Sequence, residues 1–202
     1  MALLTQGNLA AARAWLTQQP PEQEAANLAY FGAYWDLVWI FDAAQREAFL
    51  RLPAEAFGGN SATRALAFAQ VHALGGDPSE VRRYSEEGER EFRRQRADAP
   101  DDDQLLALHG LSLAYLGRRD EAIRQGERAV AVMPISRDPF SSAYIQRHLV
   151  RIYMILGERE KALDRLEPVL EIPYLLSPGW LAIDPIVAPL KGHPRVEKLL
   201  RR

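Results

Sequence analysis

A short pattern that recurs along the chain constrains its fold more than any other feature. The pattern is Leu-Gly, four charged residues, Ala and a branched aliphatic residue, and it occupies residues 116–123 and 156–163, so that its glycines lie 40 positions apart. A looser copy begins at Leu74, and the least regular copy begins at Gln6. Self-similarity at a fixed period indicates a repeat architecture, in which each unit buries its apolar face against its neighbours.

The residues on both sides of each glycine have a helical pattern. Around Gly117, apolar residues recur at spacings of three and four, over residues 105–116 before it and 122–133 after it. Glycine suits the end of a helix, because the residue after the cap often takes a positive φ. Acidic residues directly after it suit the start of the next helix. Each unit is therefore predicted to be a hairpin of two helices.

This unit resembles the tetratricopeptide repeat, a family whose unit of ~34 residues forms two antiparallel helices. The best match covers residues 103–134, where the motif's small, turn and terminating positions are occupied by Gly110, Gly117, Ala122, Ala129 and Pro134. The next unit covers residues 143–173.

The chain also departs from the family pattern. Leu106 and Leu113 replace the aromatic residues of the motif's first helix, and Val150 stands where the next unit should have a small residue. The spacing of 40 residues implies an insertion, which we place at residues 135–142.

The resemblance implies an all-α fold, a right-handed superhelix of antiparallel helix hairpins (an α-solenoid) with a C-terminal cap. Residues 1–174 are expected to form the array of about five hairpins, and residues 175–202 the capping segment. The turn glycine of the first hairpin is already residue 7, so we expect this hairpin to be truncated and the chain to be a domain fragment. A naturally short start is the alternative.

The segment 180–195 is similar to the tail that ends the tetratricopeptide regions of bacterial multidomain regulators. In those proteins a Ser/Thr kinase or a winged-helix domain precedes the repeats. The resemblance therefore implies a bacterial signalling context, not an activity of these residues.

Composition and charge exclude several classes of function. The net charge is −2, whereas nucleic-acid-binding domains are usually strongly basic, so no direct contact with nucleic acid is expected. The chain has no cysteine, and therefore no thiolate nucleophile and no cysteine zinc site. No run of apolar residues approaches a membrane span, and no signal peptide is visible at the N-terminus. We expect a cytoplasmic protein without membrane contact.

The sequence contains no pattern typical of catalysis or of a bound cofactor. No two histidines have the spacing of a helical metal site; they are His72, His109, His148 and His193. The acidic clusters at 86–91 and 98–103 are interpreted as solvated helix faces and caps, and no glycine-rich phosphate loop is present. We expect no enzyme activity, no metal and no cofactor.

The preferred interpretation is a protein–protein interaction scaffold that binds a peptide or a neighbouring domain in a concave groove. The alternative is an intramolecular regulatory or sensor domain of a bacterial kinase or transcription regulator. The resemblance implies that defined positions of the first helices line the groove. In two units these are Gln104, Ala107, Leu111, Ala114, Tyr144, Arg147, Arg151 and Met154.

Two arginines give this groove a predicted chemistry. Tyr144, Arg147 and Arg151 share one helix face, whereas the opposite face carries enough apolar residues to anchor the helix. The arginines are therefore expected to be dispensable for packing and to bind a carboxylate of an acidic peptide, a chain end or an acidic loop. The alternative is that they pair with Glu158, Glu160 or solvent.

An aromatic run over residues 30–41 has two interpretations. It is expected to lie on the first helix of the second unit, ending near Phe41, with the second helix over about 43–52. Aromatic residues at helical spacing usually belong to a core. The alternative is a groove or an interdomain contact, since a contiguous exposed patch marks an interface. A long helix is also predicted from Pro78 to about Arg96.

Overall fold

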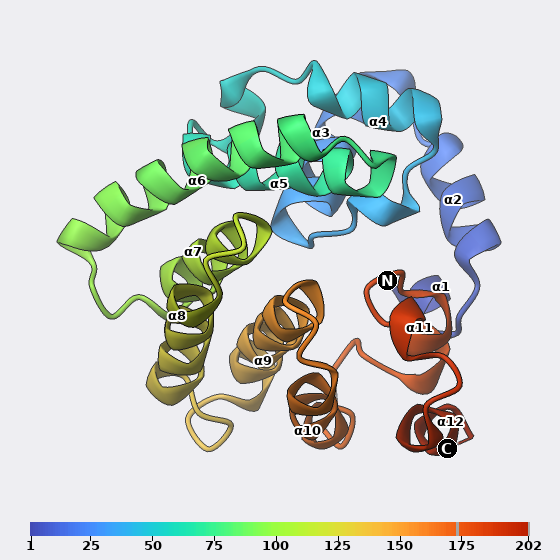
Figure 1. The fold of residues 1–202 in the computed structure, drawn as a ribbon. Helices are drawn as coiled ribbons and strands as arrows, with labels where there is room; N and C mark the ends of the chain where they lie inside the picture. Colours follow the sequence, from blue (N-terminus) through green and yellow to red (C-terminus); the bar gives the residue numbers. More distant parts are fainter. Residues whose placement is uncertain (173, 202) are drawn as a thin grey trace. The chain divides into compact units, whose positions relative to one another are not determined.

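The computed structural model describes residues 1–172 and 174–201, and within these residues the chain is helical, without a β-strand (Figure 1). The predicted all-α class is confirmed. The α-helices are α1 (Ala2–Thr5), α2 (Leu9–Thr17), α3 (Glu24–Ala29), α4 (Ala43–Leu50), α5 (Ser61–Gly75), α6 (Pro78–Asp98), α7 (Asp103–Tyr115), α8 (Arg119–Val132), α9 (Pro139–Ile155), α10 (Arg159–Val169), α11 (Pro178–Ile183) and α12 (Pro194–Leu200). Short 3₁₀ turns cover Pro21–Gln23, Val38–Ile40, Ala54–Phe57 and Ala188–Leu190, and a π-helical turn covers Tyr30–Tyr34.

The chain forms two compact units. One consists of Met1–Asn8 together with Phe92–Arg202, and we call it the terminal unit. The other consists of Leu9–Glu91, and we call it the internal unit. The division falls within α6, whose observed extent, Pro78–Asp98, agrees with the predicted helix.

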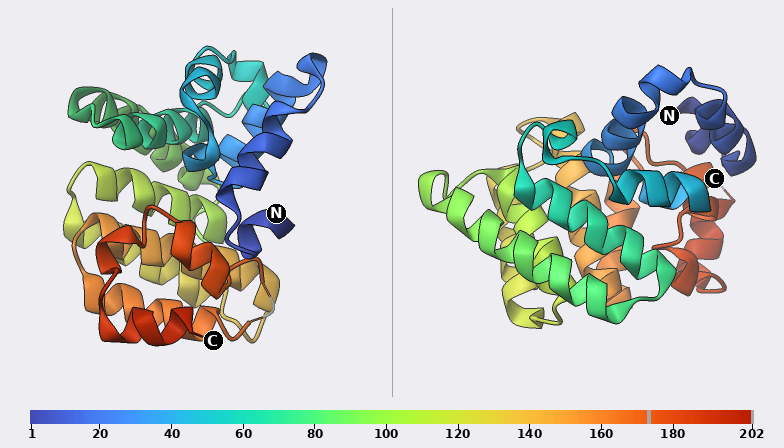
Figure 2. Two further views of the ribbon diagram at one scale, coloured as in Figure 1. Left: turned by 90° about the vertical axis from the view of Figure 1, so that its right-hand side faces the viewer. Right: turned by 90° about the horizontal axis from the view of Figure 1, so that it is seen from above.

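The terminal unit contains two helix hairpins. Helix α7 packs on α8, and α9 packs on α10, while α7 and α8 both contact α9 (Figure 2). The two best copies of the sequence pattern thus lie in consecutive hairpins, at the turns between their helices.

The two predicted turn glycines end α7 and α9 for the expected reason. Gly117 has φ 70° and Gly157 has φ 77°, a left-handed conformation that residues with a Cβ adopt rarely. After α7, the amide of Arg118 donates to the carbonyl of Leu113 at 3.0 Å. After α9, the amide of Glu158 makes the corresponding bond at 2.8 Å. This is the Schellman arrangement, which satisfies the last carbonyls of a helix.

Small residues allow the helices of the α7–α8 hairpin to approach closely. A Cβ on Gly110 would lie 3.2 Å from the carbonyl oxygen of Ala122 and 3.3 Å from the amide nitrogen of Gly126. Ala122 and Ala129 are fully buried. Ala162 is equally buried in α10. Gly110 therefore lies where α8 leaves no space for a side chain, and the three alanines lie in the core.

The beginning of the chain packs on the C-terminal segment, which the sequence did not predict. Helix α1 contacts α11, and Ser177 Oγ donates to the carbonyl of Thr5 at 2.6 Å. A Cβ on Gly179 would lie 2.5 Å from that same carbonyl oxygen. Leu4 is only 2% exposed. Residues 1–8 thus contribute to the core of the terminal unit.

In the internal unit, the predicted helix that should end near Phe41 is interrupted. Helix α3 continues into the π-helical turn, whose end is marked by a bond from the amide of Trp35 to the carbonyl of Tyr30 at 3.2 Å. Asp36 then takes a positive φ of 55°, which stops the helix. Its carboxylate accepts a buried hydrogen bond from Gln70 Nε2 at 3.0 Å. This hydrogen bond between distant residues stabilises a turn that the local sequence pattern does not predict.

Phenylalanine rings form the core behind this turn. Phe49 packs against Phe41, Phe57 and Phe68, with ring centroids 5.5–5.6 Å apart. Helix α4 begins at a capping box, in which Gln45 N donates to Asp42 Oδ1 and Asp42 N donates to Gln45 Oε1.

Candidate binding sites

The eight predicted groove residues lie on α7 and α9, but most of them do not form an open surface. Gln104 is exposed, and Tyr144 and Met154 are half-buried. The other five are buried: Ala107, Leu111, Ala114, Arg147 and Arg151. Ala107 belongs to a hydrophobic cluster of α7, α8 and α9, and Tyr144 packs against that cluster.

Arg147 is buried and lies against an aromatic ring, whereas the sequence analysis expected it to face a groove. It is 6% exposed, and its guanidinium carbon lies 5.6 Å from the ring centroid of Trp180 on α11. The indole Nε1 of Trp180 donates to Asp184 Oδ2 at 2.9 Å, and both of these residues are buried. The contact comes from the tryptophan of α11, and the spacing of residues on α9 carries no information about it. Arg151 is also 6% exposed.

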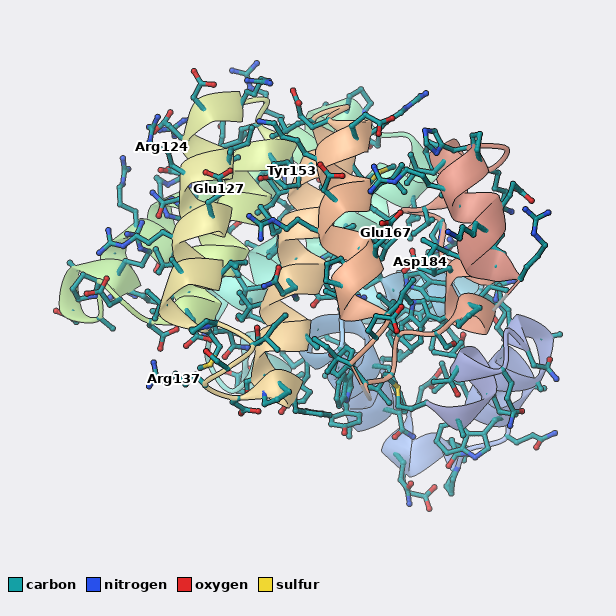
Figure 3. All side chains as sticks on the ribbon, turned by 90° about the horizontal axis from the view of Figure 1, so that it is seen from below. Arg124, Glu127, Arg137, Tyr153, Glu167 and Asp184 are labelled. Atoms are coloured by element: carbon teal, nitrogen blue, oxygen red, sulfur yellow. The ribbon has the colours of Figure 1, made fainter. Side chains whose placement is uncertain are left out.

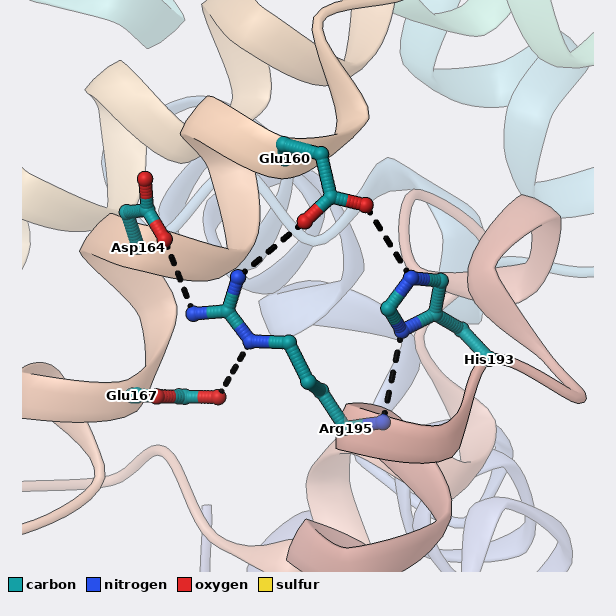
Figure 4. A network of polar contacts seen from close by, with 5 residues as sticks. All are labelled: Glu160, Asp164, Glu167, His193 and Arg195. Carbon is teal, nitrogen blue, oxygen red and sulfur yellow. Dashed lines mark hydrogen bonds and ion pairs between the residues drawn. The ribbon is translucent and has the colours of Figure 1, made fainter.

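The carboxylates that the alternative interpretation assigned to these arginines have other partners. Glu158 pairs with Arg119 of α8. Glu160 contacts Arg195 at 3.2 Å and His193 Nε2 at 3.1 Å (Figure 4).

Arg195 is the centre of an ion-pair network between α12 and α10. Its Nε donates to Glu167 at 2.8 Å and its Nη2 to Asp164 at 2.9 Å, in addition to the contact with Glu160 (Figure 4). The hydrogen bonds to Glu167 and Asp164 hold the pKa of Arg195 above its usual value. These carboxylates follow one another along a single face of α10, so the network joins α12 to α10.

A buried phenol also links the α7–α8 hairpin to the α9–α10 hairpin. Tyr153 of α9 donates its hydroxyl hydrogen to Glu127 of α8, with an O–O distance of 2.9 Å (Figure 3). Burial of the phenol and the hydrogen bond to the carboxylate raise the pKa of Tyr153 to about 12.

The internal unit carries a contiguous set of aromatic rings that we call the aromatic patch: Trp15, Tyr30, Phe31, Tyr34 and Trp35. Tyr30 and Tyr34 are stacked, with centroids 5.5 Å apart and planes 9° apart. Phe31 joins Tyr30 to Trp15 through edge contacts at 5.2 and 5.8 Å. The exposed fractions of Trp15, Tyr30 and Tyr34 are 45%, 49% and 60%.

The aromatic run therefore divides at Asp36. Trp39 and Phe41, after the turn, are buried, as the core interpretation expects. Tyr30 and Tyr34, before it, form the exposed patch that the alternative describes. The core interpretation holds for the residues after Asp36, and for the exposed rings before it an interface remains a hypothesis.

A pocket with a volume of ≈ 290 Å³ lies between α2, α3 and α4 of the internal unit. Its wall combines apolar side chains with polar ones: Leu16, Thr17, Gln19, Pro21, Glu24, Asn27, Leu28, Asp42, Ala44 and Gln45. Asn27 Nδ2 is a buried donor without a hydrogen-bond acceptor. The sequence analysis did not identify this site, because its residues come from three helices and form no motif.

Within residues 1–172 and 174–201, no three His, Asp or Glu side chains are grouped so that they could hold a metal ion. In the same part of the chain, no helix has both the length and the apolar character needed to cross a membrane. No protein-family model, curated protein or solved structure matches the chain.

Proposed function

We propose that this chain is a protein-interaction module built on tetratricopeptide-like hairpins that follow one another in a right-handed superhelix. The glycine turns after α7 and α9 and the close approach at Gly110 support this relationship. A cytoplasmic location and a bacterial regulatory parent are part of the proposal, and they rest on the resemblance of the sequence alone.

The aromatic patch is the observation that carries the interaction function. Large aromatic side chains are usually buried, and a contiguous exposed group of them marks a surface that another protein covers. Tyrosine and tryptophan are also the residues that contribute most to binding energy at interfaces. We assign the patch to an apolar segment of a partner protein, since Trp15, Tyr30 and Tyr34 present ring surface and no ionic group.

The predicted groove remains a second proposed surface, with an acidic peptide as its ligand. Arg147 would supply a planar donor fork to a carboxylate. In the structure this arginine lies against Trp180 of α11. A carboxylate can therefore bind Arg147 only if the contact between Arg147 and Trp180 is partly broken. The two surfaces differ in their response to salt, because ion pairs are screened and apolar contacts are not.

The experiment compares two matched variants as bait for a partner from the source cell. Tyr30→Ser with Tyr34→Ser changes the patch, and Phe140→Ser changes an aromatic residue that is 55% exposed on the terminal unit. We expect wild type and Phe140→Ser to bind the purified partner equally, and the double variant to bind at least about tenfold more weakly. The wild-type affinity should change little with added salt.

Three results would contradict this assignment. Equal binding of the partner by wild type and by the double variant would show that the aromatic patch is not the binding surface. Sedimentation showing that wild type self-associates through Tyr30 and Tyr34 would identify a second copy of the chain, rather than a separate partner, as the occupant. Strong weakening by salt would favour the groove.

The sensor alternative is favoured by a different observation, the pocket between α2, α3 and α4. A regulatory domain that responds to a small molecule needs a concave site with a few polar groups, and this pocket is one.

A further inference from the structure

The tyrosines of the aromatic patch are held by a backbone that packs directly on a core. Tyr30 and Tyr34 lie at the two ends of the π-helical turn, a kind of turn that is frequent at functional sites, and their rings are stacked. Between them, a Cβ on Gly32 would lie 2.5 Å from Cε2 of Phe49 and 2.9 Å from Cε2 of Phe41. The turn is therefore fixed against the phenylalanine rings before any partner binds, which lowers the cost of ordering the patch on binding.

The third exposed ring, Trp15, is held by its own helix, α2. Arg13 of this helix donates from Nε to the carbonyl of Ile40 at 2.9 Å and from Nη2 to the carbonyl of Trp39 at 3.2 Å. Leu16, which follows Trp15, is buried. These contacts hold α2 in place, while 45% of Trp15 stays exposed.

Each of the three exposed rings carries a polar group that can donate a hydrogen bond. These groups are the hydroxyls of Tyr30 and Tyr34 and the indole Nε1–H of Trp15. Within residues 1–172 and 174–201, none of these three groups has a hydrogen-bond partner in the protein. An apolar surface with three available donors favours an apolar partner that offers hydrogen-bond acceptors.

The conformation of a bound segment decides whether its backbone can offer those acceptors. The carbonyls of an α-helix accept from its own amides, except in its last turn. A segment in the polyproline II conformation has no internal hydrogen bonds, so its carbonyls are all available. Proline also has no amide N–H, and therefore leaves no donor unsatisfied against an apolar surface. Surfaces lined with aromatic rings recognise proline-rich segments for these reasons.

The size of the patch argues against a folded partner as its sole occupant. Large aromatic side chains bury about 150–250 Å² each, so the exposed fractions of Trp15, Tyr30 and Tyr34 leave roughly 200–400 Å² for a partner. A stable interface between two folded proteins, a dimer of this chain included, takes about 800 Å² from each side. A patch of this size fits a short extended segment.

We propose that the aromatic patch binds a proline-rich segment of a partner protein in the polyproline II conformation. Proline rings pack on the exposed faces of Trp15, Tyr30 and Tyr34, and the two hydroxyls and the indole N–H donate to carbonyls of the segment. This inference rests on the proposed interaction function and names the chemistry of the partner.

Two mirror-image peptides test this recognition. NMR titration of the whole chain, read at the indole N–H of Trp15, compares nona-L-proline with nona-D-proline, both with blocked ends. The peptides have the same composition and hydrophobicity, but their polyproline II helices have opposite hands. We expect nona-L-proline to bind at least about fivefold more tightly, because one hand alone presents rings and carbonyls to the patch in the required arrangement. The Trp15→Phe variant assigns the indole signal.

A variant that keeps the rings tests the hydrogen bonds. Tyr30→Phe with Tyr34→Phe removes both hydroxyl donors and leaves the aromatic surface. Each hydrogen bond is worth roughly two- to tenfold in affinity, so this variant should bind nona-L-proline at least about fourfold more weakly. Phe140→Ser is the control and should bind as wild type does, because Phe140 is an exposed ring of the terminal unit outside the patch. Circular dichroism checks that both variants fold.

Three outcomes of these titrations would overturn the proposal. They are equal affinity of wild type for the two mirror-image peptides, no shift of the Trp15 signal with nona-L-proline at millimolar concentration, and an unchanged affinity of the double phenylalanine variant. The first two use wild type, so they do not depend on whether a variant folds.

Competition separates a failure of this inference from a failure of the proposed function. Nona-L-proline should displace the purified partner from wild type. A partner that binds through Tyr30 and Tyr34 but is not displaced would refute the proline-rich class and leave the interaction function in place. A partner that binds Tyr30→Ser with Tyr34→Ser as tightly as wild type would refute the proposed function, and this inference with it.

Discussion

Replacing Gly179 by alanine tests the contact between the first residues of the chain and α11. The added Cβ would lie 2.5 Å from the carbonyl oxygen of Thr5 and 2.8 Å from the carbonyl carbon of Gln6 and the amide nitrogen of Gly7. All three are backbone atoms, which cannot rotate away as the end of a side chain can. Either the backbone shifts and α1 stays in place with strain, or α1 leaves α11.

The two routes set the expected loss of stability. Overpacking of a close contact costs about 1–3 kcal/mol. Release of α1 would expose Leu4, whose burial is worth about 1.5–3 kcal/mol, and would break the Ser177–Thr5 hydrogen bond, worth about 0.5–1.5 kcal/mol. Alanine also recovers up to about 1 kcal/mol of helix propensity within α11. The cheaper route dominates, so we expect a net loss of about 1–2 kcal/mol.

Urea denaturation followed by circular dichroism measures this loss. Hydrogen exchange at the amide of Asn8 separates the two routes, because that amide donates to the carbonyl of Leu3 at 2.9 Å while the first turn is folded. Gly75→Ala is the control: Gly75 also lies in a helix, and a Cβ there would meet nothing within 4 Å. An unfolding midpoint of Gly179→Ala equal to that of Gly75→Ala would refute the close contact.

Three further predictions concern the terminal unit. Ala122→Leu should lower the free energy of unfolding by about 1–3 kcal/mol, because Ala122 is fully buried where α8 meets Gly110; an unchanged urea midpoint would contradict this packing. The pKa of Tyr153 is raised to about 12, so its neutral form stabilises the fold below pH 10, and this stability should be lost as the pH rises from 10 to 12. Tyr153→Phe should remove this alkaline loss, which denaturation at several pH values would measure. Arg147→Ala should destabilise the chain by about 0.5–2 kcal/mol through its contact with Trp180; thermal unfolding equal to wild type would instead support the expectation that the arginine is dispensable.

The sequence predicts best those features whose cause is local. Gly117 and Gly157 end their helices because glycine takes the left-handed φ without the steric cost of a Cβ, and the residues before them carry the helical pattern. Ala122 and Ala162, the small residues that recur in the two best copies of the sequence pattern, are buried. In each case the residue type follows from a local requirement, either for a positive φ or for a small side chain.

The features that the sequence does not predict depend on contacts between distant residues. Asp36 ends the aromatic helix with the help of Gln70, which lies on another helix. Trp180 covers Arg147, although the spacing on α9 indicated a free face. The pocket around Asn27 takes its wall from three helices, so no single window of sequence contains its chemistry. Side-chain periodicity identifies a face, and only the tertiary fold identifies what lies on it.

The contact between Thr5 and Ser177 also orders events during synthesis on the ribosome. The two residues are 172 positions apart, so the first helix leaves the exit tunnel roughly 10–30 s before its partner at ~5–20 residues per second. During that interval Leu4 has no core to enter, whereas residues 9–91 already contain every segment of the internal unit. The N-terminal helix therefore meets α11 only after the whole internal unit has been synthesised, and this contact closes a long loop in the terminal unit.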